Sequence, residues 1–351
     1  MRTLKKTVAI GNVTIGGNNK IVVQSMTKTK TREVRKTINQ IQRLEKAGCE
    51  LVRLAVVNKE DAAALGYIKK RVSIPIIADI HFDYRLALAS IDQGVHKIRI
   101  NPGNIGETNK IEQIIKKAKE HNTPIRIGIN SGSLPKSILK KYEHPTPTAI
   151  IETLSDILAT FYKNNFDNIV ISAKGAAVKD TISTYETINK RFNFPLHIGI
   201  TEAGLPFRGG IKSGVGLGIL LNKGIGDTIR VSLTADPVME VAAGYEILNA
   251  LGLRQHGPIL ISCPTCGRCE VKLEKIVHAV ENRLKGYKNF MKVAVMGCVV
   301  NGPGEASEAD FGIACGKGIG AIFAKAKEIK RVKETKLVET LFELIDENIN
   351  N

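Results

Sequence analysis

The sequence contains no tryptophan, and only 5% of its 351 residues are aromatic. Proteins stack nucleic-acid bases on aromatic side chains, so this scarcity argues against base binding. No apolar run approaches the roughly 20 residues that span a bilayer. The N-terminal segment begins basic but is interrupted by Gly11, Asn12 and Gly16, unlike the continuous apolar core of a signal peptide. We expect a cytoplasmic protein that binds neither nucleic acid nor membrane.

Acidic residues are also few: 34 against 51 basic residues, which gives a formal net charge of +17. The positive electrostatic field of such a protein favours anionic partners, either acidic proteins or phosphorylated small molecules. The lysines are spread along the chain and are not gathered in one arm, so a solvated basic surface accounts for most of the excess.

A short β-branched run followed by an amphipathic helical segment occurs eight times in the first 250 or so residues. The runs are Ile21–Gln24, Leu51–Val56, Ile74–Asp79, Lys97–Asn101, Pro124–Asn130, Asn168–Lys174, Pro195–Thr201 and Asp227–Leu233. Strands that alternate with helices predict a parallel sheet. Eight units predict an α/β fold of the (β/α)8 TIM-barrel type. A doubly wound open sheet is the alternative, although its Gly-rich fingerprint is missing after the first strand.

The pattern changes after about Leu251. Strands are predicted at Ile259–Ser262, Lys292–Met296, Phe311–Ala314 and Ala321–Ala324, with a helix at Val271–Leu284 and another from Glu334. This length suffices for a small separate domain. We expect residues 1–252 to form a substrate-binding barrel and residues 253–351 to form a small α/β domain.

Polar residues alternate with isoleucine along two of the predicted strands. Arg99 and Asn101 share one face of the fourth run, as do Arg126 and Asn130 in the fifth. Since side chains alternate with period two, these residues should point into the barrel near its C-terminal mouth. The other runs end in similar residues: Arg53, Asp79, His81, Ser172, Lys174, Thr201, Glu202, Arg230 and Ser232.

Five of these side chains are basic. A single arginine at a strand end usually forms a salt bridge with a neighbour, but several converging on one rim would repel each other, and burying unpaired charge is costly. A bound phosphate or diphosphate resolves this, because arginine contacts such groups in a bidentate manner. The Gly-rich segment 209–218 has three possible roles, namely a phosphate-cradling loop, a lid, or a site of close helix packing.

Four of the six cysteines lie in two Gly- and Pro-rich loops. Without an export signal, such cysteines are more often metal ligands than disulfides. A zinc ribbon needs two C-x2-C pairs, and only the first loop has one. A [4Fe–4S] cluster is commonly held by a C-x2-C-x2-C run and one distant ligand, which on spacing alone nominates Cys263, Cys266, Cys269 and Cys298. Cys49 and Cys315 are expected to be packing residues.

Seven segments together resemble one known family. They are ADIHFDYRLAL, IRINPGNIG, IRIGINSGSL, ITEAG, GIGDTIRVSL, CPTCGR and MGCVVNGPGE. From about Val23 to about Gly320 the chain is similar to the bacterial 4-hydroxy-3-methylbut-2-enyl diphosphate synthases of the non-mevalonate isoprenoid pathway. The resemblance implies reductive ring opening of 2-C-methyl-D-erythritol 2,4-cyclodiphosphate. It also implies two electrons delivered by flavodoxin or ferredoxin through a [4Fe–4S] cluster.

The resemblance assigns roles to individual residues. It implies that Cys263, Cys266, Cys298 and Glu305 ligate the cluster. Compared with the set chosen by spacing, Glu305 takes the place of Cys269. Glu202 matches an acidic residue near the substrate oxygens and could act as general acid, or else be a carboxylate stabilising a helix start. The implied substrate-binding residues are Arg53, Asp79, His81, Arg99, Asn101, Arg126, Asn130, Lys174, Arg230 and Ser232.

The order of the two predicted domains favours a homodimer. Each barrel helix runs back from the catalytic rim, so the C-terminal domain begins at the opposite end, about 20 Å away for a 12–14-residue helix. A head-to-tail dimer, in which each cluster domain caps the partner's barrel, resolves this, and the resemblance implies the same arrangement. The alternative function is a phosphate-ligand barrel enzyme whose C-terminal module is a structural zinc or redox-sensing domain.

Overall fold

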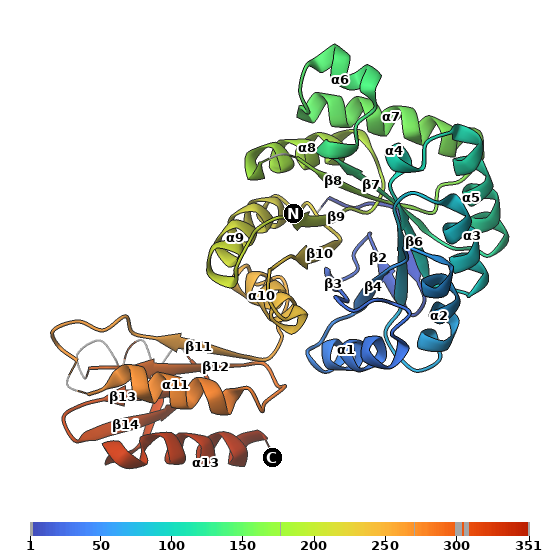
Figure 1. The fold of residues 1–351 in the computed structure, drawn as a ribbon. Helices are drawn as coiled ribbons and strands as arrows, with labels where there is room; N and C mark the ends of the chain where they lie inside the picture. The colour runs from blue at the N-terminus through green and yellow to red at the C-terminus, as the bar shows by residue number, and fades with distance from the viewer. Residues whose placement is uncertain (1–2, 176, 270, 299–303, 305–308, 350–351) are drawn as a thin grey trace. The chain divides into compact units, whose positions relative to one another are not determined.

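The computed structural model describes residues 3–175, 177–269, 271–298, 304 and 309–349. The chain divides into two compact units, Met1–Arg254 and Gln255–Asn351. Each unit is described separately below (Figure 1).

The first unit is built on eight parallel strands, one for each predicted run. They are β3 (Val22–Met26), β4 (Leu51–Ala55), β5 (Ile76–Ile80), β6 (Lys97–Ile100), β7 (Ile125–Asn130), β8 (Ile169–Lys174), β9 (His197–Ile200) and β10 (Thr228–Val231). Their order is β8-β7-β6-β5-β4-β3-β10-β9, and an isolated bridge between Ile171 and Leu196 joins the two ends. The predicted TIM barrel is therefore confirmed, and the open doubly wound sheet is wrong.

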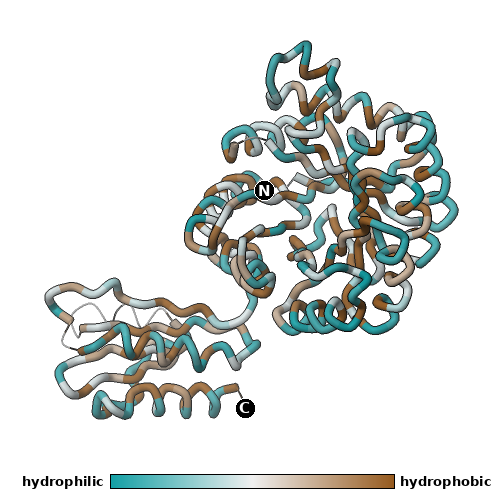
Figure 2. Tube along the Cα trace, in the orientation of Figure 1, coloured by the Kyte–Doolittle hydropathy of each residue, from teal (hydrophilic) through white to brown (hydrophobic). Residues whose placement is uncertain are grey.

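Helices follow the strands and form the outer layer of the barrel (Figure 1). The main ones are α1 (Val34–Lys46), α2 (Lys59–Lys69), α3 (Tyr84–Asp92), α5 (Thr108–Glu120), α7 (Pro147–Lys163), α8 (Val178–Arg191), α9 (Pro206–Asn222) and α10 (Pro237–Ala250). Helix α7 begins as its sequence predicts, because the Thr146 side chain accepts a hydrogen bond from the Ala149 amide and Pro147 occupies the first turn. The short helices α4 (Pro102–Ile105) and α6 (Lys136–Tyr142) lie in loops after strands. Figure 2 shows hydrophobic residues along the strands and hydrophilic ones on the outer helix surfaces.

An antiparallel hairpin that we did not predict precedes the barrel. Strands β1 (Val8–Ile10) and β2 (Val13–Ile15) have three residues each, too few for a clear alternation. Val8, Ile10 and Ile15 are buried in one cluster with four barrel residues. These are Val22, Leu51, Ile77 and Val170. The hairpin thus packs against the N-terminal halves of the barrel strands and leaves the polar groups to the other end.

The seam between β8 and β9 has few backbone hydrogen bonds, and one side chain compensates for this. The hydroxyl of Tyr185, on α8, accepts a hydrogen bond from the Ala173 amide at 3.0 Å and donates one to the His197 carbonyl at 2.6 Å. Ala173 belongs to β8 and His197 to β9. Tyr185 is 1% exposed, so no bulk water can replace it.

Tyr185→Phe should therefore destabilise the barrel measurably. Removing the hydroxyl leaves a buried amide and a buried carbonyl unpaired, at about 1–3 kcal/mol each. We expect a free energy of unfolding lower by roughly 2–4 kcal/mol in urea. Tyr162→Phe is the control, since Tyr162 is 52% exposed. Equal stability of the two variants would contradict a role for Tyr185 at the seam.

The Gly-rich segment 209–218 is not a loop, because it lies inside α9. A Cβ at Gly216 would come within 2.6 Å of Ile200 and 3.1 Å of Val178, and one at Gly209 within 2.6 Å of Leu233. Of the three roles considered, close helix packing is therefore correct for these glycines. The phosphate-cradling loop and the lid are wrong for this segment.

The second unit contains one mixed five-stranded sheet of order β11-β12-β13-β14-β15. Its strands are β11 (Pro258–Ser262), β12 (Met291–Met296), β13 (Phe311–Cys315), β14 (Ile319–Ala324) and β15 (Lys327–Lys333). Helices α11 (Leu273–Leu284) and α13 (Leu337–Ile349) pack on one face through Val280, Leu341 and Ile345. Strand β15 was not predicted, because its sequence KEIKRVK is mostly charged. Among the described helices of both units, none combines the length and apolarity needed to cross a membrane.

Candidate active site

Polar side chains from six barrel strands surround a cavity of about 70 Å³ at the C-terminal mouth. Its lining residues are Arg53, Arg99, Arg126, Ile129, Asn130, Ser172, Ala173, Lys174, Tyr185, His197, Gly199, Thr201, Arg230 and Ser232. All five basic side chains expected to converge on this rim line the one cavity. The period-two alternation therefore placed these side chains correctly.

Asp79 is the carboxylate at the centre of these cations. Its oxygens lie 3.2 Å from Arg99 Nη1, 3.5 Å from Arg53 Nε and 3.4 Å from His81 Nε2. Burial alone would raise the pKa of Asp79, but Arg53, His81 and Arg99 outweigh it and hold this pKa well below its usual range. Asp79 is therefore ionised and positions Arg53 and Arg99, and it leaves the other cations uncompensated.

Gly128 makes room for Arg99. A Cβ at position 128 would come within 2.4 Å of Arg99 Nε, so only glycine lets the guanidinium lie across β7. The Gly128 carbonyl accepts a hydrogen bond from Arg99 Nη2 at 3.5 Å. The glycine in IRIGIN thus has a steric role in the site.

Arg126 and Arg230 add two more buried positive charges to this mouth. Arg126 is 2% exposed, and among the described residues neither its Nε and Nη1 atoms nor Arg230 Nε has a hydrogen-bond partner. Burial and, to a lesser extent, Arg53 lower the pKa of Arg230 to about 10. Burial, Arg53 and Arg99 likewise lower the pKa of Arg126. Such unsatisfied cations are the expected lining of an anion site.

Two buried basic groups were missed in the sequence. Lys97 is fully buried, its Nζ atom has no hydrogen-bond partner among the residues that the structure describes, and burial together with Arg126 and Arg53 lowers its pKa. The alternation Lys97-Ile98-Arg99 could have revealed it, because Lys97 shares the face of Arg99. His197 is buried too, with Nδ1 2.7 Å from Thr228 Oγ1, and burial and Arg126 lower its pKa. A low pKa keeps this imidazole neutral.

Lys174 and Glu202 form an ion pair at the rim of the cavity. Lys174 ends β8, and Glu202 follows β9 with a φ of 55°, a left-handed conformation that a non-glycine residue seldom adopts. The Glu202 side chain is 81% exposed. Its carboxylate is thus held beside the cavity by Lys174 and is accessible to a ligand.

Four further predicted residues lie at or near this mouth. Asn130 and Ser232 line the cavity. Asn101 is buried at the start of α4, and its amide nitrogen has no hydrogen-bond partner within the described ranges. His81 contacts Arg99 and Asp79 but does not line the cavity. Unpaired amide and hydroxyl groups here suit a polar ligand.

The cysteines lie at the ends of two adjacent strands of the second unit. Cys263 and Cys266 follow β11 and Cys298 follows β12, which pairs with β11 in parallel register as far as Ser262 and Val295. The Cys263 amide donates to the Val295 carbonyl at 3.3 Å. Glu305 lies outside the described residues. Among the residues that are described, no three His, Cys, Asp or Glu side chains are arranged to hold a metal ion.

Cys269 lies close to the second cysteine loop, but its sulfur forms a hydrogen bond with the backbone. Its Sγ donates a hydrogen bond to the Val271 carbonyl at 3.3 Å, and a Cβ at Gly297 would come within 2.9 Å of that sulfur. Cys49 and Cys315 are buried, as expected of packing residues, and burial raises the pKa of each to about 12.

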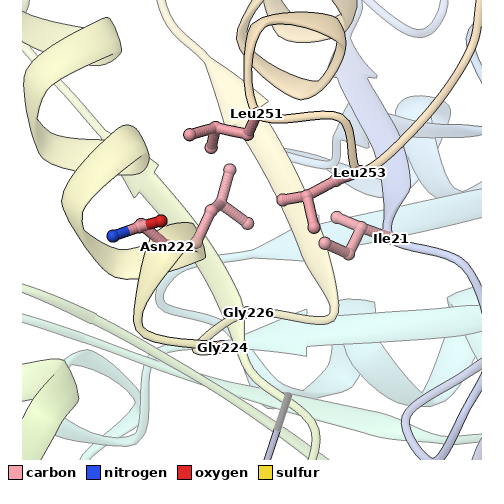
Figure 3. A pocket seen from close by; sticks show the side chains of 7 residues that line it. Ile21, Asn222, Gly224, Gly226, Leu251 and Leu253 are labelled. Atoms are coloured by element: carbon pink, nitrogen blue, oxygen red, sulfur yellow. The ribbon is translucent and has the colours of Figure 1, made fainter. Parts of the chain in front are cut away.

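A second cavity, of about 180 Å³, lies against the loops at the other end of the barrel strands and serves as a contrast. Figure 3 shows Ile21, Leu251 and Leu253 around it, with Gly224 and Gly226 below. It has no titratable side chain, so it offers no acid–base or anion-binding chemistry.

Comparison with known families agrees with both units. A sequence model described as the GcpE TIM-barrel domain matches residues 5–245, and one described as the GcpE protein C-terminal domain matches residues 259–347. The chain belongs to the GcpE family.

Curated relatives of this chain are named 4-hydroxy-3-methylbut-2-en-1-yl diphosphate synthase (flavodoxin). That of Clostridium tetani is 54% identical over 96% of this chain and 97% of its own. That of Thermodesulfovibrio yellowstonii is 53% identical over 98% and 99%.

Solved structures support the barrel alone. A dihydropteroate synthase of Xanthomonas albilineans superposes with a TM-score of 0.51 at 13% identity, and covers 71% of this chain and 97% of its own. One from Vibrio fischeri gives 0.51 at 13% identity, over 70% and 98%. At such identity the likeness extends to the fold and no further.

Proposed function

We propose that this GcpE-family chain is a 4-hydroxy-3-methylbut-2-en-1-yl diphosphate synthase. It would open the ring of 2-C-methyl-D-erythritol 2,4-cyclodiphosphate by two-electron reduction, with loss of one oxygen as water. The relatives' name motivates the proposal. The structural observation that carries it is the surplus of buried cations at the mouth, where the single negative charge of Asp79 cannot balance Arg53, Arg99, Arg126 and Arg230.

In this proposal the arginines bind the diphosphate. The unsatisfied guanidinium atoms of Arg126 and Arg230 would donate to phosphate oxygens, and Asp79 would keep Arg53 and Arg99 oriented. Because these donors already lie in place in a water-poor cavity, they need little reorganisation when charge develops on the phosphate end. Asn101, Asn130 and Ser232 would contribute neutral donors.

Glu202 would act as the general acid for the departing hydroxyl. Its carboxylate is accessible and paired with Lys174, so substrate binding at Lys174 would release it toward the ligand. The positive φ of Glu202 supports a functional constraint, since such strain is often kept where geometry serves a site. The alternative role as a helix-start carboxylate is less well supported, because Glu202 precedes α9 by four positions.

A [4Fe–4S] cluster would supply electrons and a Lewis-acidic iron to this reaction. Cys263, Cys266 and Cys298 suit such a group because soft thiolates bind iron firmly, and they start from neighbouring strand ends. Glu305 is proposed as the fourth, more weakly held ligand on the family resemblance. The hydrogen bond from Cys269 to Val271 supports leaving Cys269 out of the set.

A head-to-tail homodimer is proposed from where the chain leaves the barrel. Arg254 donates to the Ile21 carbonyl at 2.6 Å and contacts Glu50 at 3.2 Å. Ile21 directly precedes β3, so this contact ties the linker to the N-terminal ends of the strands, opposite the mouth. The chain thus leaves the barrel at the end opposite its own mouth, which supports capping of a partner's barrel.

Mixing two inactive variants tests this arrangement. Lys174→Met should impair the barrel and Glu305→Ala the cluster unit, so each homodimer should be nearly inactive. A hybrid dimer contains one site built from two unaltered units. Refolded or co-expressed mixtures should recover up to about a quarter of wild-type activity, the statistical share of intact sites. If no mixture exceeds either parent, both units of a site belong to one chain.

The function itself is tested by anaerobic turnover. Reconstituted protein, cyclodiphosphate and reduced flavodoxin should yield the linear diphosphate, detected by ³¹P NMR as loss of the cyclic signals. A colourless protein that carries zinc and leaves the substrate intact would instead favour a phosphate-binding barrel with a structural zinc module.

A further inference from the structure

The sheet of the second unit has a hollow on the face opposite α11 and α13. Alternate residues of its strands divide into two clusters: Ile313 and Ile322 pack toward the helices, whereas Ala314 and Ala321 face the other way. The hollow, of about 680 Å³, lies on that second face. Its lining residues are Ala314, Gly316, Lys317, Ile319, Gly320, Ala321, Glu328, Arg331, Val332 and Lys333.

The lining of this hollow is basic. It contains three basic side chains, Lys317, Arg331 and Lys333, and one acidic one, Glu328, so positive charge predominates. Helix α13, on the opposite face, carries four acidic residues and no basic residue. The hollow therefore has a net positive charge that helix α13 does not share.

Apolar side chains lie exposed within the same basic region. Ile319 is 55% exposed and lines the hollow, and Ile329, on β15, is 48% exposed. An apolar centre with a charged rim is typical of protein–protein interfaces. This combination favours a macromolecular partner over a small anion, for which exposed isoleucines would serve no purpose.

The hollow lies beside the strand ends from which the cysteine loops begin. Strands β11, β12 and β13 are parallel, so Cys315 at the end of β13 lies at the same end of the sheet as Cys263 and Cys298. Ile319 pairs with Lys333, so the end of β15 lies at this end of the sheet as well. Besides burial, Glu334 and Cys269 each raise the pKa of Cys315, so both lie within electrostatic range of it.

We propose that this surface, the hollow with Lys317, Ile319, Arg331 and Lys333 at its rim, is the docking site of an acidic electron-donor protein of the flavodoxin type. The proposal rests on the proposed function. Complementary charge would steer the donor and set its register, and the isoleucines would give the encounter a short-range contact. Only electrons would pass here: the donor's reduced flavin is oxidised, the iron of the cysteine site is reduced, and no covalent bond changes.

Charge reversal of two rim lysines tests the proposal. Lys317→Glu/Lys333→Glu changes exposed side chains of the second unit, which are not among the residues that line the barrel cavity. Lys275→Glu/Lys285→Glu is the matched control, because both residues are exposed in or just after α11 and the change in net charge is identical. Two readouts apply: the Kd for purified flavodoxin by calorimetry, and the ratio of flavodoxin-driven to dithionite-driven turnover.

We expect the rim variant to raise the Kd at low salt about tenfold or more, and to lower the rate ratio by a similar factor. The control should shift both by less than about twofold, and high salt should shrink the difference. Equal effects of the two variants would overturn the proposal, since net charge alone would then explain them. A change in oligomeric mass for the rim variant alone would also overturn it, in favour of a contact between copies. Failure of the proposed function is distinguishable, because wild-type protein would then turn over with neither reductant while the Kd remains measurable.

Discussion

Cys298→Ser is expected to give a folded protein that binds no [4Fe–4S] cluster and has no reductase activity. Cys298 is 9% exposed and follows β12, beside the strand that leads to Cys263. A serine hydroxyl is a much poorer iron ligand than a thiolate. Iron and sulfide per chain should fall to near zero after anaerobic reconstitution, and the visible absorption of the cluster should disappear.

Cys269→Ser is the matched control for this prediction. It removes a thiol from the same loop system, three residues from Cys266, but one whose sulfur donates to a backbone carbonyl. We expect unchanged iron content and at most a severalfold loss of activity. If Cys269→Ser loses the cluster as Cys298→Ser does, Cys269 is a ligand, which favours the set nominated by spacing over the set implied by the family.

Arg126→Met should change stability and activity in opposite directions. Two guanidinium nitrogens of Arg126 are buried without a hydrogen-bond partner in the described part of the chain, and burial, Arg53 and Arg99 lower the pKa of Arg126. Removing this charge relieves repulsion and desolvation, so the ligand-free protein should be more stable by roughly 1–3 kcal/mol. Binding of the diphosphate should weaken by about 2–5 kcal/mol, because a charged contact is lost from a buried site. Thermal unfolding with and without substrate, and kcat/KM, measure the two effects.

The control is Arg71→Met, which changes an arginine that stacks on Tyr67 at the outer surface of the barrel. It should leave kcat/KM unchanged and should not raise the melting temperature. If Arg126→Met is destabilising in the absence of substrate, the cavity is not electrostatically strained, and the case for an anion site loses its main support.

The sequence predicted the parts of this fold that depend on periodicity. Eight β-branched runs followed by amphipathic helices specify a barrel, and the alternation at Arg99 and Arg126 places both side chains in the lumen. The start of a helix also depends on neighbouring residues, as Thr146 and Pro147 show at the start of α7. In each case the determining interactions lie within a few residues of one another.

Features that depend on distant contacts were missed. Strand β15 is mostly charged, and pairing with β14 rather than its own pattern makes it a strand. Lys97 was overlooked because a lysine at a strand start is normally exposed, and only the closed barrel buries it. The sequence left three roles open for the glycines of α9, since the need for small residues arises from Ile200 and Leu233 on other elements.

The β1–β2 hairpin has a consequence for the order of folding. Its buried side chains contact Val22, Leu51 and Ile77, but also Val170, which belongs to the sixth barrel strand. Chains are synthesised at about 5–20 residues per second from the N-terminus, so the hairpin emerges many seconds before its last partner. Contacts so distant in sequence form late. Val8, Ile10 and Ile15 therefore lack one of their packing partners until Val170 has been synthesised, which makes this apolar segment a target for a chaperone during synthesis.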